Sequence, residues 1–394
     1  MADLALDLDH PVHDADNHYY EALDAFTRHL DPAVAKRCVQ WCDIDGRKYH
    51  VLGGRVSRAV TNATFNPISK PGVLADFFRG NPDNANPLEL LRDHEPIRAA
   101  YREPAARTTT LDEQGLASCW LFPTLGMVYE TPLRDDPFAV ATTFRAFNRW
   151  LADDWPLDHP RIVAAPYITL ADPAGAVEEL EWALTGGARL LVMLPTAPIT
   201  AVGRLSPFDP AFDPFWARVN EARIPVVLHA GDSGLSSDGY APDGFAADFQ
   251  GGFGPSIKFF AIEQAIHTWM LAMMLSNLPA RFPNLRFASV ENGAEFLGDL
   301  FRKLRSITKK VPGWFADDPV EIFRRHVWIN PFWEDDVATV VEQMGADRVL
   351  FGSDWPHIEG MPAPLDYLVE VKDLTPAQRL RVLWANAQEL VPTR

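Results

Sequence analysis

Residues 349–357 read Val-Leu-Phe-Gly-Ser-Asp-Trp-Pro-His, and this stretch points to the fold. An apolar run ends in Gly-Ser and is followed directly by Asp354 and a proline-containing loop. α/β barrels place their catalytic groups at the carboxyl ends of buried parallel strands. Two further runs end in the same way, one in Asp16-Asn17-His18 and one in His229. Asp and His at three such ends make a metal site the first hypothesis.

Eight short apolar runs with polar ends are spread along the chain, and helical patterns separate most of them. This alternation predicts parallel β/α architecture, and eight nearly continuous apolar strands fit a closed (β/α)8 TIM barrel. An open, doubly wound sheet is the alternative, but no glycine-rich dinucleotide-binding motif follows any strand. The predicted strands are Val12–Tyr19, Ala117–Pro123, Ile162–Thr169, Ala188–Leu194, Pro225–Ala230, Leu285–Val290, Val327–Pro331 and Arg348–Ser353. The predicted helices are Phe138–Leu151, Pro173–Leu184, Phe212–Ala222, Lys258–Leu278, Ala294–Ile307, Glu334–Met344 and Ala377–Val391.

Two long segments break the alternation in a chain that we expect to form a single domain over residues 1–394. The first, at about 21–115, is too long for one βα unit, and we predict an insertion after strand one. It contains Asp45-Gly46-Arg47, a typical hairpin turn. The second, 231–256, is rich in glycine and directly follows His229, which predicts a lid over the site.

Composition excludes several classes of function. The 394 residues include 53 acidic and 36 basic side chains, for a net charge of −17, which disfavours binding to nucleic acid. The acidic start of the chain does not resemble a signal peptide, and no apolar run is long enough to span a membrane. Three cysteines, Cys38, Cys42 and Cys119, predict no disulfide framework. We therefore expect a cytoplasmic protein.

Three positions have the residue types of a metal site. Asp16 and His18 stand two apart on a predicted strand, so their side chains point to the same face. His229 follows a buried apolar run, and a neutral imidazole is a common ligand of zinc, iron or manganese. Asp354 could bind the metal or take a proton from a metal-bound water. Ordinary explanations are a polar strand end for the first pair and a hydrogen-bonded core histidine for His229.

Glu291 and His357 are less specific signals. Glu291 ends the predicted sixth strand, where it could be a metal ligand, a bridging ligand or a general base. Because a predicted helix begins just after it, Glu291 could instead be a capping or salt-bridged acid. His357 lies three residues after Asp354 and could contact substrate, or be an ordinary loop histidine.

The order of these strand ends resembles the amidohydrolase superfamily. Within it, the chain is similar to the branch that contains aminocarboxymuconate semialdehyde decarboxylase and the resorcylate-type decarboxylases, over about residues 14–386. The run Gly352-Ser353-Asp354-x-Pro356 is the most specific part of the resemblance. Where the family usually has a histidine at the end of strand six, this chain has Glu291. The resemblance implies one divalent ion bound by Asp16, His18, His229 and Asp354.

The expected function is a metal-dependent enzyme that hydrolyses or decarboxylates a small organic acid, or its amide or ester. Asp354 and Glu291 would be its acid–base groups, with zinc, manganese or iron as the ion. One ion is expected, but Glu291 enriches the site in carboxylates and two could bind. A two-metal, oxygen-activating hydroxylase on the same fold is therefore an alternative. A catalytically silent metal-binding subunit is another, and we expect a homo-oligomer or a complex with a related subunit.

Overall fold

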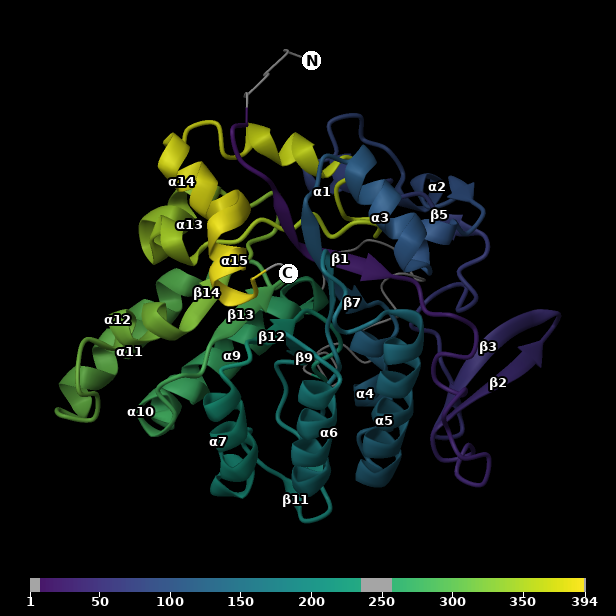
Figure 1. The fold of residues 1–394 in the computed structure, drawn as a ribbon, viewed down its shortest axis with the longest axis horizontal. Coiled ribbons are helices and arrows are strands. Elements are labelled where there is room, and N and C mark those ends of the chain that lie inside the picture. Colours follow the sequence, from purple (N-terminus) through teal and green to yellow (C-terminus); the bar gives the residue numbers. More distant parts are fainter. Residues whose placement is uncertain (1–7, 235–256, 393–394) are drawn as a thin grey trace.

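The computed structural model describes residues 8–234 and 257–392, and short parallel strands lie at its centre with helices outside them (Figure 1). In this part of the chain the central strands form a three-stranded ladder, β1-β7-β8, and a four-stranded ladder, β9-β12-β13-β14. Their bounds are β1 His13–Tyr19, β7 Ser118–Pro123, β8 Ile162–Ala164, β9 Leu191–Met193, β12 Val226–His229, β13 Phe287–Val290 and β14 Val327–Ile329.

Single bridges join the two ladders into a ring. Beyond the end of β8, Tyr167 pairs with Val192 in β9 in parallel orientation. The predicted strand Ile162–Thr169 is thus only partly a regular strand, because a gap separates β8 from this bridge.

An eighth segment, 349–355, closes the ring without forming a regular strand. Its backbone bonds to Ile329 at the end of β14 and to Ala15 in β1, each at 2.8 Å. Farther along, the carboxylate of Asp14 accepts from the backbone nitrogen of Ser353 at 2.9 Å. A side chain takes the place of a backbone acceptor there. The predicted strand Arg348–Ser353 is therefore an extended segment without a continuous ladder of backbone hydrogen bonds. The result is a mixed α/β fold of the TIM-barrel type.

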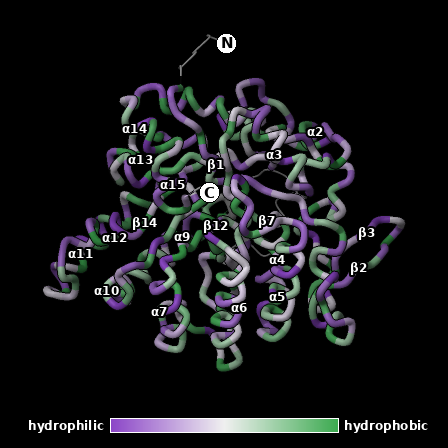
Figure 2. The backbone as a smooth tube through the Cα atoms, viewed as in Figure 1, coloured by the Kyte–Doolittle hydropathy of each residue, from purple (hydrophilic) through white to green (hydrophobic). Residues whose placement is uncertain are grey.

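Helices surround the ring, and α5, α6 and α7 lie side by side outside the strands (Figure 1). Hydrophobic and hydrophilic residues alternate along these outer helices, as expected for helices with one face on the barrel (Figure 2). The predicted C-terminal helix is divided into α14, a π-helical turn at Arg381–Ala385, and α15. The helices that follow β7 are α4 Gly126–Leu133, α5 Pro137–Asp154, α6 Pro173–Thr185, α7 Asp213–Ala222, α9 Ala261–Leu275, α10 Leu278–Arg281, α11 Phe296–Lys310, α12 Pro319–His326, α13 Val337–Met344, α14 Pro376–Leu380 and α15 Asn386–Leu390.

The segment between β1 and β7 contains the predicted hairpin, which projects from the side of the molecule (Figure 1). Asp45 and Gly46 both have positive φ, 54° and 76°, which matches the twist of a tight hairpin. The assignment of residues 21–115 as an insertion stays a prediction. The elements in this segment are β2 Val39–Ile44, β3 Arg47–Leu52, β4 Arg55–Val56, β5 Ile68–Ser69, α1 Ala75–Phe78, α2 Pro87–Leu90, β6 His94–Glu95 and α3 Pro104–Glu113. A two-stranded hairpin elsewhere consists of β10 Ile199–Thr200 and β11 Gly203–Arg204.

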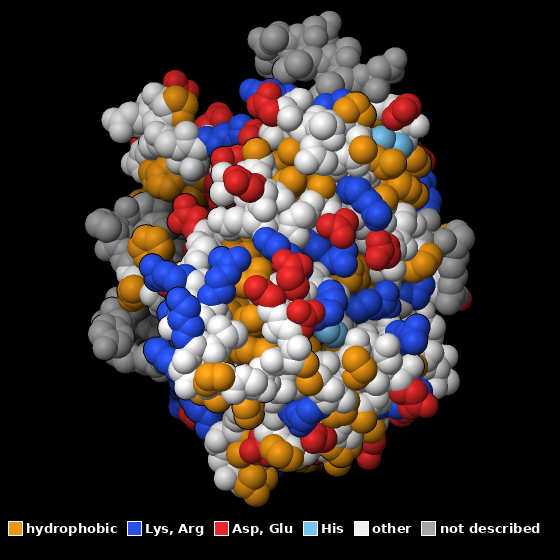
Figure 3. Space-filling model, turned by 90° about the vertical axis from the view of Figure 1, so that its left-hand side faces the viewer, with side chains coloured by type: hydrophobic (Ala, Val, Ile, Leu, Met, Phe, Trp, Pro, Cys, Tyr) orange, Lys and Arg blue, Asp and Glu red, His pale blue; other side chains and the backbone are white. Residues whose placement is uncertain are grey.

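Charges of both signs are interspersed on the face drawn in Figure 3, so the excess of acidic residues does not form one patch there. No helix in the described ranges has both the length and the apolar character needed to cross a bilayer. Cys38, Cys42 and Cys119 are free, as the sequence predicted.

Candidate metal centre

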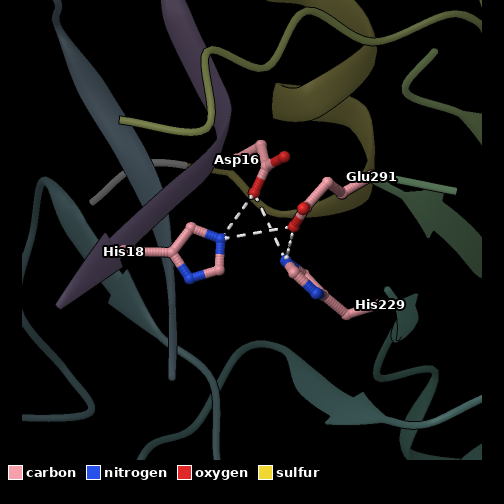
Figure 4. A group of neighbouring side chains, drawn as sticks. All are labelled: Asp16, His18, His229 and Glu291. Atoms are coloured by element: carbon pink, nitrogen blue, oxygen red, sulfur yellow. Dashed lines mark hydrogen bonds and ion pairs between the residues drawn. The ribbon is translucent and has the colours of Figure 1, made fainter. Parts of the chain in front are cut away.

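Two strands of the ring bring Asp16, His18 and His229 together (Figure 4). Asp16 and His18 project from the same face of β1, and His229 is the last residue of β12. The Oδ1 atom of Asp16 lies 3.2 Å from Nε2 of His18 and 3.3 Å from Nε2 of His229. All three side chains are buried. The residues that the sequence singled out on strands one and five therefore meet at one point.

Glu291 reaches the same point from the end of β13 (Figure 4). Its Oε2 atom lies 3.7 Å from Nε2 of His18 and 3.5 Å from Nε2 of His229. The backbone of Glu291 is left-handed, with φ of 56°. The buried side chain of Asn292 stabilises this turn by donating to the backbone oxygens of Leu228 and Val290, each at 2.8 Å. Glu291 thus points into the cluster and is not a helix-capping residue.

Asp354 and His357 form a second group beside the first. Oδ1 of Asp354 lies 3.4 Å from Nε2 of His18 and 2.6 Å from Nδ1 of His357. The described residues contain two sets of possible metal ligands. In each set, the ligand atoms all lie within 4.8 Å of one another. They share His18 and Glu291; the first adds Asp16 and His229, and the second adds Asp354 and His357.

The orientation of the two imidazole rings suits a cation. Nδ1 of His18 donates to the backbone oxygen of Pro123 at 3.1 Å, and Nδ1 of His229 donates to that of Ala230 at 2.9 Å. A carbonyl oxygen can only accept, so Nδ1 of each ring has a hydrogen, and in the neutral form of the ring the lone pair of Nε2 faces the cluster. Metal-bound histidines are held in this way.

Burial controls the protonation of these groups. It lowers the pKa of His18 to about 3, so a second proton on this ring is disfavoured. For Glu291, burial and the nearby charges of Asp354 and Asp16 raise the pKa well above the usual range. For Asp354, burial is again the main cause of a pKa well above the usual range.

These directions describe acidic groups and nitrogen lone pairs crowded together, so that without a cation Glu291 and Asp354 keep a proton more readily than exposed carboxyl groups do. A divalent cation would relieve the repulsion, and the residues fit one. Two imidazole nitrogens and several carboxylate oxygens form a donor set suited to manganese, iron or zinc.

The sequence interpretation did not single out Asp14 or Arg107. The buried carboxylate of Asp14 accepts from Ser353 Oγ at 2.6 Å and from Asn17 Nδ2 at 2.8 Å. The buried guanidinium of Arg107 contacts the side chain of Asn17 and donates to the backbone oxygen of His18 at 2.5 Å. These contacts hold β1 in place, and neither Asp14 nor Arg107 stands in a sequence pattern that would have singled it out.

The predicted lid lies mostly outside the described residues, at 235–256. At its start, a Cβ on Gly231 would lie 2.3 Å from the backbone oxygen of Met127. Only glycine fits this close approach, so the chain leaves β12 directly against α4. The lid itself stays a prediction.

Comparison with known proteins identifies the family. A family model described as Amidohydrolase matches residues 122–393, which is more than half of the sequence. The chain belongs to the amidohydrolase family. This confirms the resemblance found in the sequence, and His229, Glu291 and Asp354 lie inside the matched range.

Individual relatives agree with this assignment. The crystal structure of an amidohydrolase from Mycobacterium avium subsp. paratuberculosis K-10 superimposes with a TM-score of 0.90 and 38% identity, over 97% of this chain and 98% of that one. A gamma-resorcylate decarboxylase from Rhodococcus jostii (strain RHA1) is 26% identical over 295 residues, or 72% of this chain and 86% of the relative. A dihydroxybenzoic acid decarboxylase from Polaromonas sp. JS666, solved with manganese and the inhibitor 2-nitroresorcinol, has the same fold, with 22% identity, a TM-score of 0.57 and coverage of 81% and 92%.

Proposed function

We propose that this amidohydrolase is a metal-dependent decarboxylase of a small aromatic acid. The observation that carries the proposal is the convergence of four buried or half-buried donors, with the Nε2 lone pairs of two histidines facing one point. The reaction class is supported by the relatives, among which are the gamma-resorcylate decarboxylase and the manganese-containing dihydroxybenzoic acid decarboxylase.

Asp16, His18, His229 and Glu291 would hold the ion, with Asp354 beside them. Manganese is the first choice because the Polaromonas decarboxylase was solved with it, and the donor set also suits zinc and iron. When bound, the ion supplies positive charge that attracts an acidic substrate and stabilises the negative charge that develops as the carboxylate departs.

Asp354 and His357 would supply the proton that the reaction consumes. Decarboxylation breaks the bond between the ring carbon and the carboxylate, releases CO2 and leaves an electron pair on that carbon, which then takes up a proton. The contact of 2.6 Å between Asp354 Oδ1 and His357 Nδ1 is a hydrogen bond and so contains a proton, beside His18. Because burial raises the pKa of Asp354 well above its usual range, this carboxyl group holds that proton more readily than an exposed aspartate does.

The test uses metal-free protein loaded with Mn²⁺ and incubated in D2O with a panel of hydroxybenzoic acids. We expect release of CO2 and a product with one deuterium at the carbon that carried the carboxylate, detected by NMR. Asp354→Asn should lower the rate by about 100-fold or more, as expected for loss of an acid–base group, with metal content measured in parallel. If no hydroxybenzoic acid loses CO2 while amides or esters of these acids are cleaved, the chain is a hydrolase.

The second donor group favours one other candidate. Because His18 and Glu291 belong to both groups, two ions could bind side by side, as in a two-metal oxygen-activating hydroxylase. Counting metal ions per chain and measuring oxygen uptake separates the two functions. One ion without oxygen uptake supports the decarboxylase, and two ions with substrate-dependent uptake support the hydroxylase. A fully loaded chain with no turnover of any kind would support the catalytically silent subunit.

A further inference from the structure

The last residue of β7 and the loop that follows it contact two of the imidazoles at the site. The backbone oxygen of Pro123 accepts from His18, as described above. The next residue, Thr124, lies against His357, with its Oγ1 atom 2.9 Å from Nε2 of that ring. The same hydroxyl lies 2.8 Å from the backbone oxygen of Tyr19.

The direction of these two hydrogen bonds follows from the groups involved. A hydroxyl has one hydrogen to donate, and a backbone carbonyl can only accept, so the hydrogen of Thr124 is used on Tyr19. Toward His357 the hydroxyl oxygen can then only accept. Nε2 of His357 must therefore carry a hydrogen, which leaves Nδ1 as the atom that faces Asp354 at 2.6 Å.

The loop that holds Thr124 is itself fixed. The backbone nitrogen of Gly126 donates to the buried carboxylate of Glu21 at 3.0 Å. A Cβ on Gly126 would lie 2.7 Å from the side chain of Pro123, so the loop and the start of α4 pack without free space. Thr124 is thus held against His357 by contacts on both sides of it in the chain.

We propose that Thr124 is a positioning residue that keeps the hydrogen of His357 on Nε2 and directs Nδ1 at Asp354. Its effect on catalysis rests on the proposed function, since it acts through the pair that would supply the proton. The position of the hydrogen on the His357 ring does not depend on that function and can be tested alone.

The direct test is NMR of metal-free protein labelled with 15N-histidine, with His357→Gln used to assign the signals of that ring. In the wild-type chain we expect protonated Nε2 on His357. Thr124→Val is nearly the same size but cannot accept, and it should shift the Nε2 signal of His357. Thr124→Ser keeps the hydroxyl and should preserve the wild-type signal.

A kinetic test follows if the wild-type chain decarboxylates a substrate. Thr124→Val should lower kcat by about 10- to 100-fold, the range expected for a misplaced catalytic group, with KM changed by less than about threefold. Thr124→Ser should stay within about threefold of wild type. Thr109→Val is the matched control, because Thr109 is exposed on α3 and its hydroxyl bonds only to a helix carbonyl, at 3.3 Å.

The proposal is overturned if Nε2 of His357 carries no hydrogen in the wild-type chain, a result that needs no variant to fold. It is also overturned if Thr124→Val folds and leaves the His357 signals unchanged. An inactive wild-type chain with the expected NMR result would reject the proposed function and support the role of Thr124.

Discussion

Asp14 and Asp16 are buried aspartates two residues apart on β1, yet their surroundings differ completely. Asp14 accepts hydrogen bonds from Asn17 and Ser353 at 2.6–2.9 Å and from the backbone nitrogen of Asp16 at 3.1 Å. The carboxylate of Asp16 instead faces the Nε2 atoms of two histidines whose hydrogens are on Nδ1.

The difference separates a structural carboxylate from a proposed metal ligand. Donors from the protein satisfy the oxygens of Asp14, although burial still raises its pKa to about 6, and these bonds tie β1 to the segment that closes the barrel. Asp16 lacks such donors, and a buried charge without them is costly unless a cation binds. The two aspartates are equally buried, so their hydrogen-bond partners are the reason that we assign Asp16, and not Asp14, to the proposed metal site.

The largest expected effect comes from the same substitution made at both positions. Asp16→Asn should lower metal affinity by about 100-fold or more and nearly abolish activity, because even residues outside the ligand set usually contribute 10- to 100-fold. Asp14→Asn should keep the affinity within about tenfold of wild type. Competition with a chelator, followed by metal analysis of the protein, measures both values.

Stability of the metal-free proteins provides the control for this pair. Asp16→Asn should be at least as stable as wild type, since it removes one charge from a crowded cluster. If Asp14→Asn lost as much metal as Asp16→Asn, the distinction between the two aspartates would be wrong.

The second prediction concerns folding. Asp14→Ala leaves buried donors of Ser353 and Asn17 unpaired, so the free energy of unfolding should fall by about 3 kcal/mol. Urea unfolding of the metal-free chain measures it. Asp24→Ala is the control: Asp24 pairs with Arg28 at 3.0 Å but is 52% exposed, so its loss should cost less than about 1 kcal/mol. Equal losses for the two variants would show that Asp14 is not a tie between β1 and the closing segment.

Much of this arrangement could be predicted from the sequence. Short apolar runs that end in polar residues indicated the parallel strands, and the two-residue spacing placed Asp16 and His18 on one face. Turn chemistry at Asp45-Gly46 indicated the hairpin. Each of these signals lies within a few residues of sequence, so it can be recognised without knowing which distant residues it contacts in the fold.

The roles of Asp14 and Thr124 could not be predicted, because they depend on distant partners. Ser353, which satisfies Asp14, lies 339 residues away in the chain, and His357, which Thr124 contacts, lies 233 away. The direction of Glu291 likewise depends on a left-handed backbone and on the bonds of Asn292, neither of which has a sequence signal. Long-range hydrogen bonds decide how these side chains are oriented.

Glu291 offers an intermediate case, since its side chain is 18% exposed and reaches the cluster from a turn. Glu291→Gln keeps the shape and removes the charge, so metal affinity should fall by about tenfold, less than for Asp16→Asn. The number of ions per chain should stay at one. Metal analysis that showed two ions in wild type and one in this variant would instead favour a carboxylate shared between two metals.

The smallest expected effect extends the comparison to the histidines of β1. His13 is buried, bonds to Ser118 Oγ at 2.7 Å, and has an Nε2 atom without a hydrogen-bond partner in the described chain. Burial, then the charge of Arg189, lowers its pKa to about 3. Between the unfolded value of 6.5 and this value, the unfolded chain binds one more proton than the folded chain. The contribution of His13 to stability is therefore present above about pH 6.5 and is lost as the pH falls, by up to about 1.4 kcal/mol per pH unit.

His13→Asn removes this titration while keeping a polar group that can reach Ser118. Urea unfolding of the metal-free proteins at pH 7, 6 and 5 should show wild type losing stability faster than the variant, by about 1 kcal/mol per pH unit below pH 6. His94→Asn is the control and should follow wild type, because His94 is exposed in β6. Parallel curves for wild type and His13→Asn would mean that the folded chain accepts the proton on His13. In that case burial on β1 would not be enough to keep an imidazole neutral. The free lone pair that we assign to Nε2 of His18 would then depend on the bound metal.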